Sequence, residues 1–129
     1  MGRKYLNDIG VKDTVIDLAD DPRKTIWEKE IKKYGFASYE TWAMDCFFYA
    51  WLYERLKMFL EVNCIDLNYH KFEYEGKEYT QLELINKMIY GCEVYFKNNY
   101  DDLSSPEEDI KAVNDIAKIW AIVLPAMWW

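Results

Sequence analysis

The sequence predicts an all-α fold: a compact bundle of about four helices, with a small β-hairpin or an ordered loop between the second and third helices. Four segments place apolar residues at helical spacing and are bounded by capping residues, Pro or Gly. One segment, 65–79, breaks the helical period. With 129 residues, 51% of them apolar, the chain suits one domain over 1–129. The weakly periodic residues 1–20 are expected to form an arm that docks loosely or stays free.

The first clear helix is predicted to begin at Asp21-Pro22. Proline suits the first helical position, because the N–H that it lacks would have no partner there. Gly35 is expected to end the helix as its C-cap. An apolar stripe lies between these signals and consists of Ile26, Trp27, Ile31 and Tyr34.

The second predicted helix has Ser38 as its N-cap, Glu40 in its first turn, and runs to about Asn63. Between Trp42 and Tyr53 nearly every residue is apolar. A helix that is apolar on all sides is expected to be covered on all sides. We therefore expect a second copy of the chain to cover part of it, which makes the protein a homo-oligomer.

The hairpin or loop is centred on Glu75-Gly76, with aromatic residues alternating on either side. Thr80-Gln81-Leu82-Glu83 is a capping box that begins the third helix. One face of this helix is expected to be buried, and Gly91 within it indicates a close helix crossing. The face consists of Leu82, Ile85, Met88, Ile89, Cys92, Tyr95 and Phe96.

The last helix is predicted to begin at a second capping box, Ser105-Pro106-Glu107-Glu108. Pro125 ends or kinks it, and residues 126–129 are expected to form a terminal plug. The face that we expect to be buried has helical spacing and consists of Ile110, Val113, Ala117, Trp120 and Leu124.

Composition argues against several classes of function. A single His cannot supply a multi-His metal site and no Cys-x-x-Cys pair is present, so neither a metal nor a cofactor is expected. Sixteen basic against 23 acidic side chains, a net charge of −7, argue against a broad nucleic-acid-binding surface. Cys46, Cys64 and Cys92 are interpreted as structural thiols in apolar helical stretches, and less readily as a nucleophile paired with His70. No catalytic residue is assigned.

The sequence also predicts a location. The charged N-terminus lacks the apolar core of a signal peptide. The longest apolar runs, 46–53 and 119–129, fall short of the ~18–20 residues that a membrane-spanning helix needs. We therefore expect a soluble, cytoplasmic protein with no membrane partner.

Asp45 is the most unusual residue of the second predicted helix. Trp42, Asp45 and Tyr49 share one helical face in an apolar stretch, where a carboxylate is costly unless a donor satisfies it. Two interpretations stay open: a polar contact inside a ligand or partner pocket lined by the two aromatic rings, or a structural hydrogen bond. The basic segment 23–33 is either a solvated face or a place for an anion or an acidic patch of a second subunit.

An acidic cluster precedes and begins the last helix. Such a cluster is usually a solvated helix start, favoured by the helix dipole. Its sharper interpretation is a phosphate-mimicking patch that binds a basic protein. The cluster consists of Asp101, Asp102, Glu107, Glu108 and Asp109.

Several short motifs occur in a familiar order. They are Tyr34-Gly35-Phe36, Glu40 to Asp45 with its Trp-x-x-Asp, Trp51 to Lys57, Leu84 to Ile89, and the tryptophan-rich Leu124 to Trp129. In this order residues 34–129 resemble a widespread group of small uncharacterised bacteriophage and prophage proteins, which typically show a Gly-Phe, a Trp-x-x-Asp, a Leu-x-x-Leu with basic residues, a Leu-x-x-Met-Ile and a tryptophan-rich end. The chain departs from the pattern at Glu54, where the group often has Pro, and at Met58, where a basic residue is common. The resemblance implies a phage origin and expression in a bacterial host's cytoplasm, and no established activity.

The residues and the resemblance together favour a non-enzymatic phage accessory protein that counters bacterial defence by binding. Its most specific form is a sponge that sequesters a nucleotide immune signal. Trp42 or Tyr49 would stack on the base, beside Asp45, and Arg55 or Lys57 would hold phosphate. The alternatives are an acidic inhibitor of a host defence protein, in which the acidic cluster mimics nucleic acid, and a structural or assembly protein of the particle.

Overall fold

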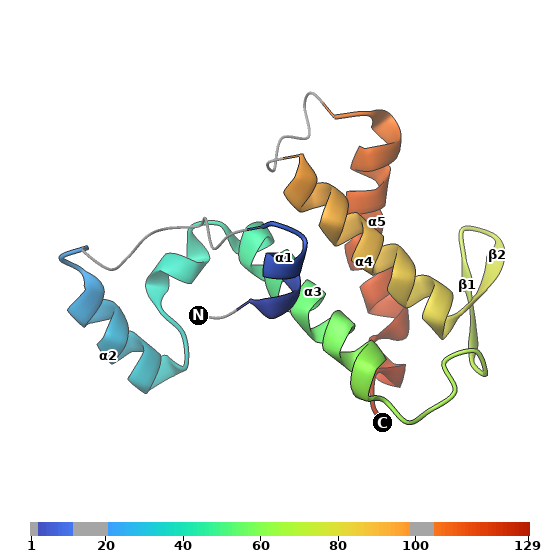
Figure 1. The fold of residues 1–129 in the computed structure, drawn as a ribbon, viewed down its shortest axis with the longest axis horizontal. Helices are drawn as coiled ribbons and strands as arrows, with labels where there is room; N and C mark the ends of the chain where they lie inside the picture. Colours follow the sequence, from blue (N-terminus) through green and yellow to red (C-terminus); the bar gives the residue numbers. More distant parts are fainter. Residues whose placement is uncertain (1–2, 12–20, 99–104) are drawn as a thin grey trace. The chain divides into compact units, whose positions relative to one another are not determined.

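The computed structural model describes residues 3–11, 21–98 and 105–129 (Figure 1). In these ranges the chain forms five α-helices, two short 3-10 helices and one two-stranded sheet, which confirms the predicted, mostly helical class. The chain divides into two compact units, Met1–Glu54 and Arg55–Trp129. The expectation of a single domain stays a prediction.

The first unit contains three helical elements and part of a fourth. They are α1 (Lys4–Asp8), α2 (Lys24–Tyr34), the 3-10 helix η1 (Ser38–Thr41) and the part of α3 (Met44–Val62) that precedes residue 55. Helix α1 was not predicted as an element, and lies in the expected N-terminal arm with Tyr5 and Leu6 buried. Residues 12–20 of that arm lie outside the described residues.

Helix α2 begins two residues later than predicted, because Pro22 lies in the preceding turn and Arg23 is the N-cap. Gly35 is the C-cap as expected: its φ of 86° is left-handed, and its N–H donates to the Ile31 carbonyl at 2.9 Å. Of the predicted apolar stripe only Trp27 is buried. The other members, Ile26, Ile31 and Tyr34, are exposed.

The second predicted helix is two elements, η1 and α3, separated by a turn at Trp42-Ala43. Ser38 is not an N-cap, since its N–H and hydroxyl both donate to the Glu30 carboxylate at 2.9 Å and so join η1 to α2. Glu40 instead accepts from the Ala37 N–H at 2.8 Å.

Helix α3 is not covered on all sides. One side is buried and includes Cys46, Ala50, Leu52, Tyr53 and Leu56. Large apolar side chains on or beside the helix are nevertheless exposed, and these are Trp42, Met44, Trp51, Met58 and Val62. The expectation of complete coverage is therefore wrong for the chain by itself, and the homo-oligomer stays a prediction.

The second unit contains the hairpin and two long helices. Its elements after α3 are β1 (Lys71–Tyr74), β2 (Lys77–Thr80), α4 (Gln81–Lys97), α5 (Glu107–Val123) and the 3-10 helix η2 (Leu124–Ala126). The strands are antiparallel, with Phe72 opposite Tyr79. Glu75 and Gly76 have φ of 50° and 76°, which forms the two-residue hairpin turn and confirms the predicted hairpin.

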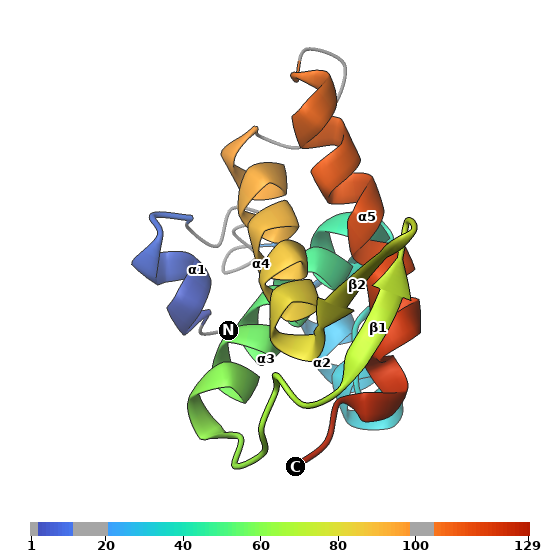
Figure 2. The same ribbon diagram turned by 90° about the vertical axis from the view of Figure 1, so that its right-hand side faces the viewer.

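Helix α4 follows the sequence closely. The predicted capping box is present: the Thr80 hydroxyl accepts from the Glu83 N–H at 3.2 Å, and the Glu83 carboxylate accepts from the Thr80 N–H at 3.0 Å. The predicted face is buried apart from the partly exposed Leu82. Gly91 marks the predicted crossing, because a Cβ there would lie 2.6 Å from the Ala112 carbonyl oxygen. Helices α4 and α5 accordingly lie side by side (Figures 1 and 2).

Helix α5 turns a different face to the core than predicted. It begins at Glu107 with Pro106 as N-cap, one residue later than the predicted box, and buries Ile116, Ile119 and Val123. The predicted face is partly or fully exposed, and consists of Ile110, Val113, Ala117, Trp120 and Leu124. The helix carries two apolar stripes, and the one adjoining Ala112 packs at Gly91.

The chain's last residues are held by a buried amide. Gln81 is fully buried, and its Nε2 donates to the Ala126 carbonyl at 3.1 Å and to the Met127 sulfur at 3.6 Å. Trp128 and Trp129 are exposed, so the expected terminal plug is wrong for these two side chains.

Candidate functional site

Four aromatic side chains of the first unit pack together, and we name Trp27, Tyr39, Trp42 and Phe47 the aromatic cluster. The Trp27 ring lies edge-on to Tyr39 and Trp42, with centroids 5.1 Å and 5.9 Å away. The ring of Tyr39 also packs against that of Phe47, with the two centroids 5.9 Å apart. Trp27 is 4% exposed, whereas Trp42 is 53% exposed. The buried ring therefore supports an outer ring that half faces solvent.

A cation lies against this cluster. The Arg23 guanidinium is 4.9 Å from the ring centroid of Trp27 and 5.1 Å from that of Trp42, within cation–π distance of both. Asp21 orients it: one carboxylate oxygen accepts from Arg23 Nε at 3.1 Å, and the other from Nη2 at 3.0 Å. These hydrogen bonds lower the pKa of Asp21 and raise that of Arg23. The arrangement places a planar cation and a half-exposed indole next to each other.

The predicted ligand-binding residues are divided between the two units. Trp42, Asp45 and Tyr49 belong to the first unit, and Arg55 and Lys57 belong to the second. Within the first unit Trp42 is joined by Arg23, which the prediction did not include. A pocket that unites all five residues stays a prediction.

Asp45 is exposed and lies in the first turn of α3. The premise that its carboxylate is desolvated is therefore wrong. Because the Trp42-Ala43 turn interrupts the predicted helix, Asp45 sits near a helix start, where the dipole favours a negative charge. A role of Asp45 in ligand binding stays a prediction.

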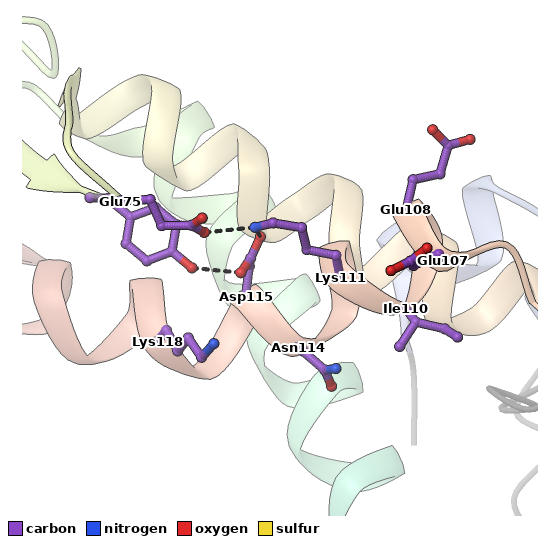
Figure 3. A pocket seen from close by; sticks show the side chains of 9 residues that line it. Glu75, Glu107, Glu108, Ile110, Lys111, Asn114, Asp115 and Lys118 are labelled. Carbon is purple, nitrogen blue, oxygen red and sulfur yellow. Dashed lines mark hydrogen bonds and ion pairs between the residues drawn. The ribbon is translucent and has the colours of Figure 1, made fainter.

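The second unit has an open groove of about 810 Å³ between the hairpin turn and α5 (Figure 3). Four carboxylates and two ammonium groups line it. The Tyr74 hydroxyl donates to Asp115 at 2.6 Å, and Lys111 lies 2.6 Å from Glu75 and 2.8 Å from Asp115. These contacts tie the hairpin to α5 and offset much of the groove's charge.

The same contacts shift the pKa values of the group. Partial burial raises the pKa of Asp115, but the hydrogen bonds from Lys111 and Tyr74 outweigh burial, so the net pKa is below its usual value. Burial and the hydrogen bond to Asp115 raise the pKa of Tyr74. Hydrogen bonds to Asp115 and Glu75 raise that of Lys111. At neutral pH, Glu75, Lys111 and Asp115 are therefore charged, and the Tyr74 hydroxyl keeps its proton.

Part of the predicted acidic cluster lines this groove. Glu107 and Glu108 are exposed at its edge (Figure 3). Asp109 is partly buried, and its carboxylate accepts a long hydrogen bond of 3.4 Å from Asn98, so it also joins the start of α5 to the end of α4. Asp101 and Asp102 lie outside the described residues.

The cysteines divide by environment. Cys46 and Cys92 are buried as expected, and burial raises the pKa of the Cys92 thiol to about 12. Cys64 is exposed after the end of α3, so the expectation that it is buried in a helix is wrong. His70 lines a separate pocket of about 200 Å³ with Tyr69 and Trp128, and no cysteine is among that pocket's lining residues.

The described ranges contain neither a metal-binding cluster nor a membrane-spanning helix. No group of three or more His, Cys, Asp or Glu side chains there could hold a metal ion. Likewise, none of the helices in the described part is long and apolar enough to cross a membrane.

The sequence pattern indicated Trp42 as a ligand-binding residue but did not place Arg23, Trp27 and Tyr39 beside it. Arg23 and Trp27 are four residues apart, the spacing at which helical side chains meet, and this was the available signal. The contact with Trp42 depends on η1 folding back onto α2 and has no local signature.

Comparison with known proteins assigns no ligand to the site. No family model, no curated protein and no solved structure matches the chain.

Proposed function

We propose that this protein acts by binding rather than by turnover, and that it binds a nucleotide-type ligand at Trp42 and Arg23. The observation that carries the proposal is the half-exposed Trp42 indole beside the Arg23 guanidinium. Trp42 would stack on a base, and Arg23 would take the phosphate. Both are placed by the aromatic cluster and by Asp21, so little would need to be ordered on binding.

The chemistry of the two groups favours this ligand class. Every base has a π-face, and stacking on an aromatic side chain contributes about 1–3 kcal/mol per base. The bidentate ion pair with Asp21 uses Nε and Nη2 of Arg23, and the Arg23 side chain is 53% exposed. A phosphate would bind the guanidinium N–H donors that Asp21 does not use, so Arg23 could hold a phosphate while Asp21 keeps it in place.

The biological setting follows from the resemblance to phage and prophage proteins. In a bacterial host, a protein that binds a nucleotide without converting it would remove that nucleotide from signalling. We therefore propose an anti-defence role, the sequestration of a nucleotide immune signal. Tyr49, Arg55 and Lys57 remain candidates for further contacts to the ligand.

Native mass spectrometry of the protein, purified gently from bacterial cells, tests the ligand class directly. Extra mass that matches a nucleotide is expected, and the same spectrum reports the number of subunits. Removal of that mass by mild denaturation would show that it is held noncovalently. A bare protein mass, together with no binding in the titration below, would contradict the proposal.

A titration with AMP tests the assignment of Trp42. Because stacking contributes about 1–3 kcal/mol, we expect Trp42→Ala to raise the Kd about 5- to 150-fold. Arg23→Ala should raise it as well. Trp128→Ala is the matched control, since Trp128 is an exposed indole of the second unit. Equal affinities for wild type and Trp42→Ala would show that the site lies elsewhere.

A second candidate is the acidic inhibitor, favoured by the exposure of Glu107 and Glu108 at the groove. It predicts a salt-sensitive complex with a basic protein. Exchanging both residues for Gln should weaken capture of that protein. Glu28→Gln with Glu73→Gln makes the same charge change at exposed positions that do not line the groove. If both pairs bind alike, the groove is not the interface.

A further inference from the structure

Helix α1 is held in place by a residue far away in the sequence. One oxygen of the Glu54 carboxylate accepts from the Tyr5 N–H at 3.2 Å, and the other from the Leu6 N–H at 3.0 Å. The first N–H groups of a helix have no partner within the helix, so this carboxylate satisfies two of them. Tyr5 and Leu6 are also 5% and 0% exposed.

These contacts explain why α1 exists at all. Isolated helices shorter than about 12 residues are marginal in water, and α1 has five residues. The burial of Tyr5 and Leu6 and the hydrogen bonds to Glu54 therefore stabilise it in place. Removing any of these should undock the helix rather than merely loosen it.

Helix α1 also reaches the aromatic cluster. Phe47 and Glu54 are seven positions apart on α3, so they lie on the same side of that helix two turns apart. The Arg3 guanidinium, next to α1, is 5.9 Å from the Phe47 ring centroid. The Phe47 ring packs against Tyr39, and the ring centroid of Tyr39 lies 6.4 Å from that of Trp42. A continuous chain of contacts therefore runs from α1 to the outer ring of the site.

We propose that Glu54 is a positioning residue for the candidate site. By docking α1, it holds Arg3 against Phe47, and Phe47 in turn fixes Tyr39 and the exposed Trp42. Undocking of α1 would leave Phe47 with one neighbour fewer and give the outer ring more freedom. The effect on ligand affinity rests on the proposed function, whereas the effect on the rings is a property of the free protein.

NMR spectroscopy of the ligand-free protein tests the positioning. In Glu54→Gln we expect the Tyr5 and Leu6 amides to exchange faster by tenfold or more. The indole N–H signals of Trp27 and Trp42 should shift, while that of Trp128 should not. Glu73→Gln is the control, because it makes the same charge change at an exposed position of β1. Protected α1 amides in Glu54→Gln would overturn the anchoring role.

A second variant separates the docking of α1 from any defect in α3. Leu6→Ala removes buried contact from α1 and leaves α3 unchanged. It should expose the same amides and shift the same two indole signals. If α1 undocks in either variant while the Trp27 and Trp42 signals stay in place, the coupling to the cluster is refuted.

AMP affinity then links the coupling to function. Below the unfolding transition, Glu54→Gln is expected to raise the Kd at least about fivefold, the lower end of coupling between distinct sites. A role in stability alone would leave the Kd unchanged, and that result would limit Glu54 to holding α1. If wild type shows neither a bound nucleotide in the native mass spectrum nor binding of AMP, the proposed function fails, and the indole signals still decide the positioning.

Discussion

Replacing Gly91 by Ala tests the packing of the second unit. At an exposed helical position this change would stabilise the helix by about 1 kcal/mol, because Ala has the higher helix propensity. Here the new Cβ would lie 2.6 Å from the Ala112 carbonyl oxygen and 2.7 Å from Ile116 Cγ1. An ordinary contact begins near 3.4 Å, so α4 and α5 would have to separate by roughly 0.8 Å.

The magnitude follows from these two opposing effects. Overpacking a core costs about 1–3 kcal/mol, and the upper end applies because the nearest atom belongs to the backbone and cannot rotate away. Subtracting the gain in propensity, we expect Gly91→Ala to lower the free energy of unfolding by about 2 kcal/mol. Adding Ile116→Val should recover little, since it leaves the Ala112 oxygen in place.

Urea denaturation followed by far-UV circular dichroism measures this change as a lower midpoint at constant slope. Asn86→Ala is the control, because Asn86 is exposed on the same helix. It should raise the free energy of unfolding by about 0.5 kcal/mol through propensity alone. A Gly91→Ala protein that is as stable as wild type, or more stable, would refute the close crossing.

Two further changes test the hairpin network and the thiols. Tyr74→Phe removes the hydroxyl that donates to Asp115, and we expect the free energy of unfolding at pH 7 to fall by about 1–2 kcal/mol in the same urea assay. Because the folded-state pKa of Asp115 lies below its usual 3.8, the stability it contributes is present above that pH and is lost as the pH falls through the folded-state value. The difference between Tyr74→Phe and wild type should therefore shrink below pH 3.8, and a constant difference would contradict the assignment. Among the thiols, Cys64 alone is exposed, so a thiol-reactive reagent at pH 8 should add one label to the native protein and none to Cys64→Ser, as counted by mass spectrometry.

Features that depend on a few neighbouring residues were predictable from the sequence. The Thr80 capping box, the Gly35 C-cap and the place of Gly76 in the hairpin turn each follow from the conformations that those residue types favour. Gly91 was informative for a similar reason: a glycine within a helix indicates a close neighbour without naming it.

Features that depend on a distant partner were not predictable. Helix α5 carries two apolar stripes, and only the position of Gly91 on α4 decides that Ile116 and Ile119 are buried. The apolar character of a residue also does not reveal whether another part of the chain covers it, which is why Trp128 was expected in a terminal plug and is exposed.

The candidate site shows the same division. Trp42 stood out in the sequence, but its contact with Arg23 forms only because η1 returns the chain to α2. Asp45 was expected in the middle of a helix because the sequence gives no strong signal for the break at Trp42-Ala43. Without that break, a first-turn carboxylate was taken for one in the middle of a helix.

The turn at Glu75 has a consequence for the order in which the second unit folds. Its left-handed backbone would suit Asn or Asp better than Glu, so the isolated hairpin is poorly encoded. The ion pair that supports it comes from Lys111, 36 residues later in the chain. A contact over that distance carries a large loop-closure entropy. We therefore expect the hairpin to form after α4 and α5 have packed, with φ-values near zero for substitutions at Tyr74 and Glu75 in folding kinetics.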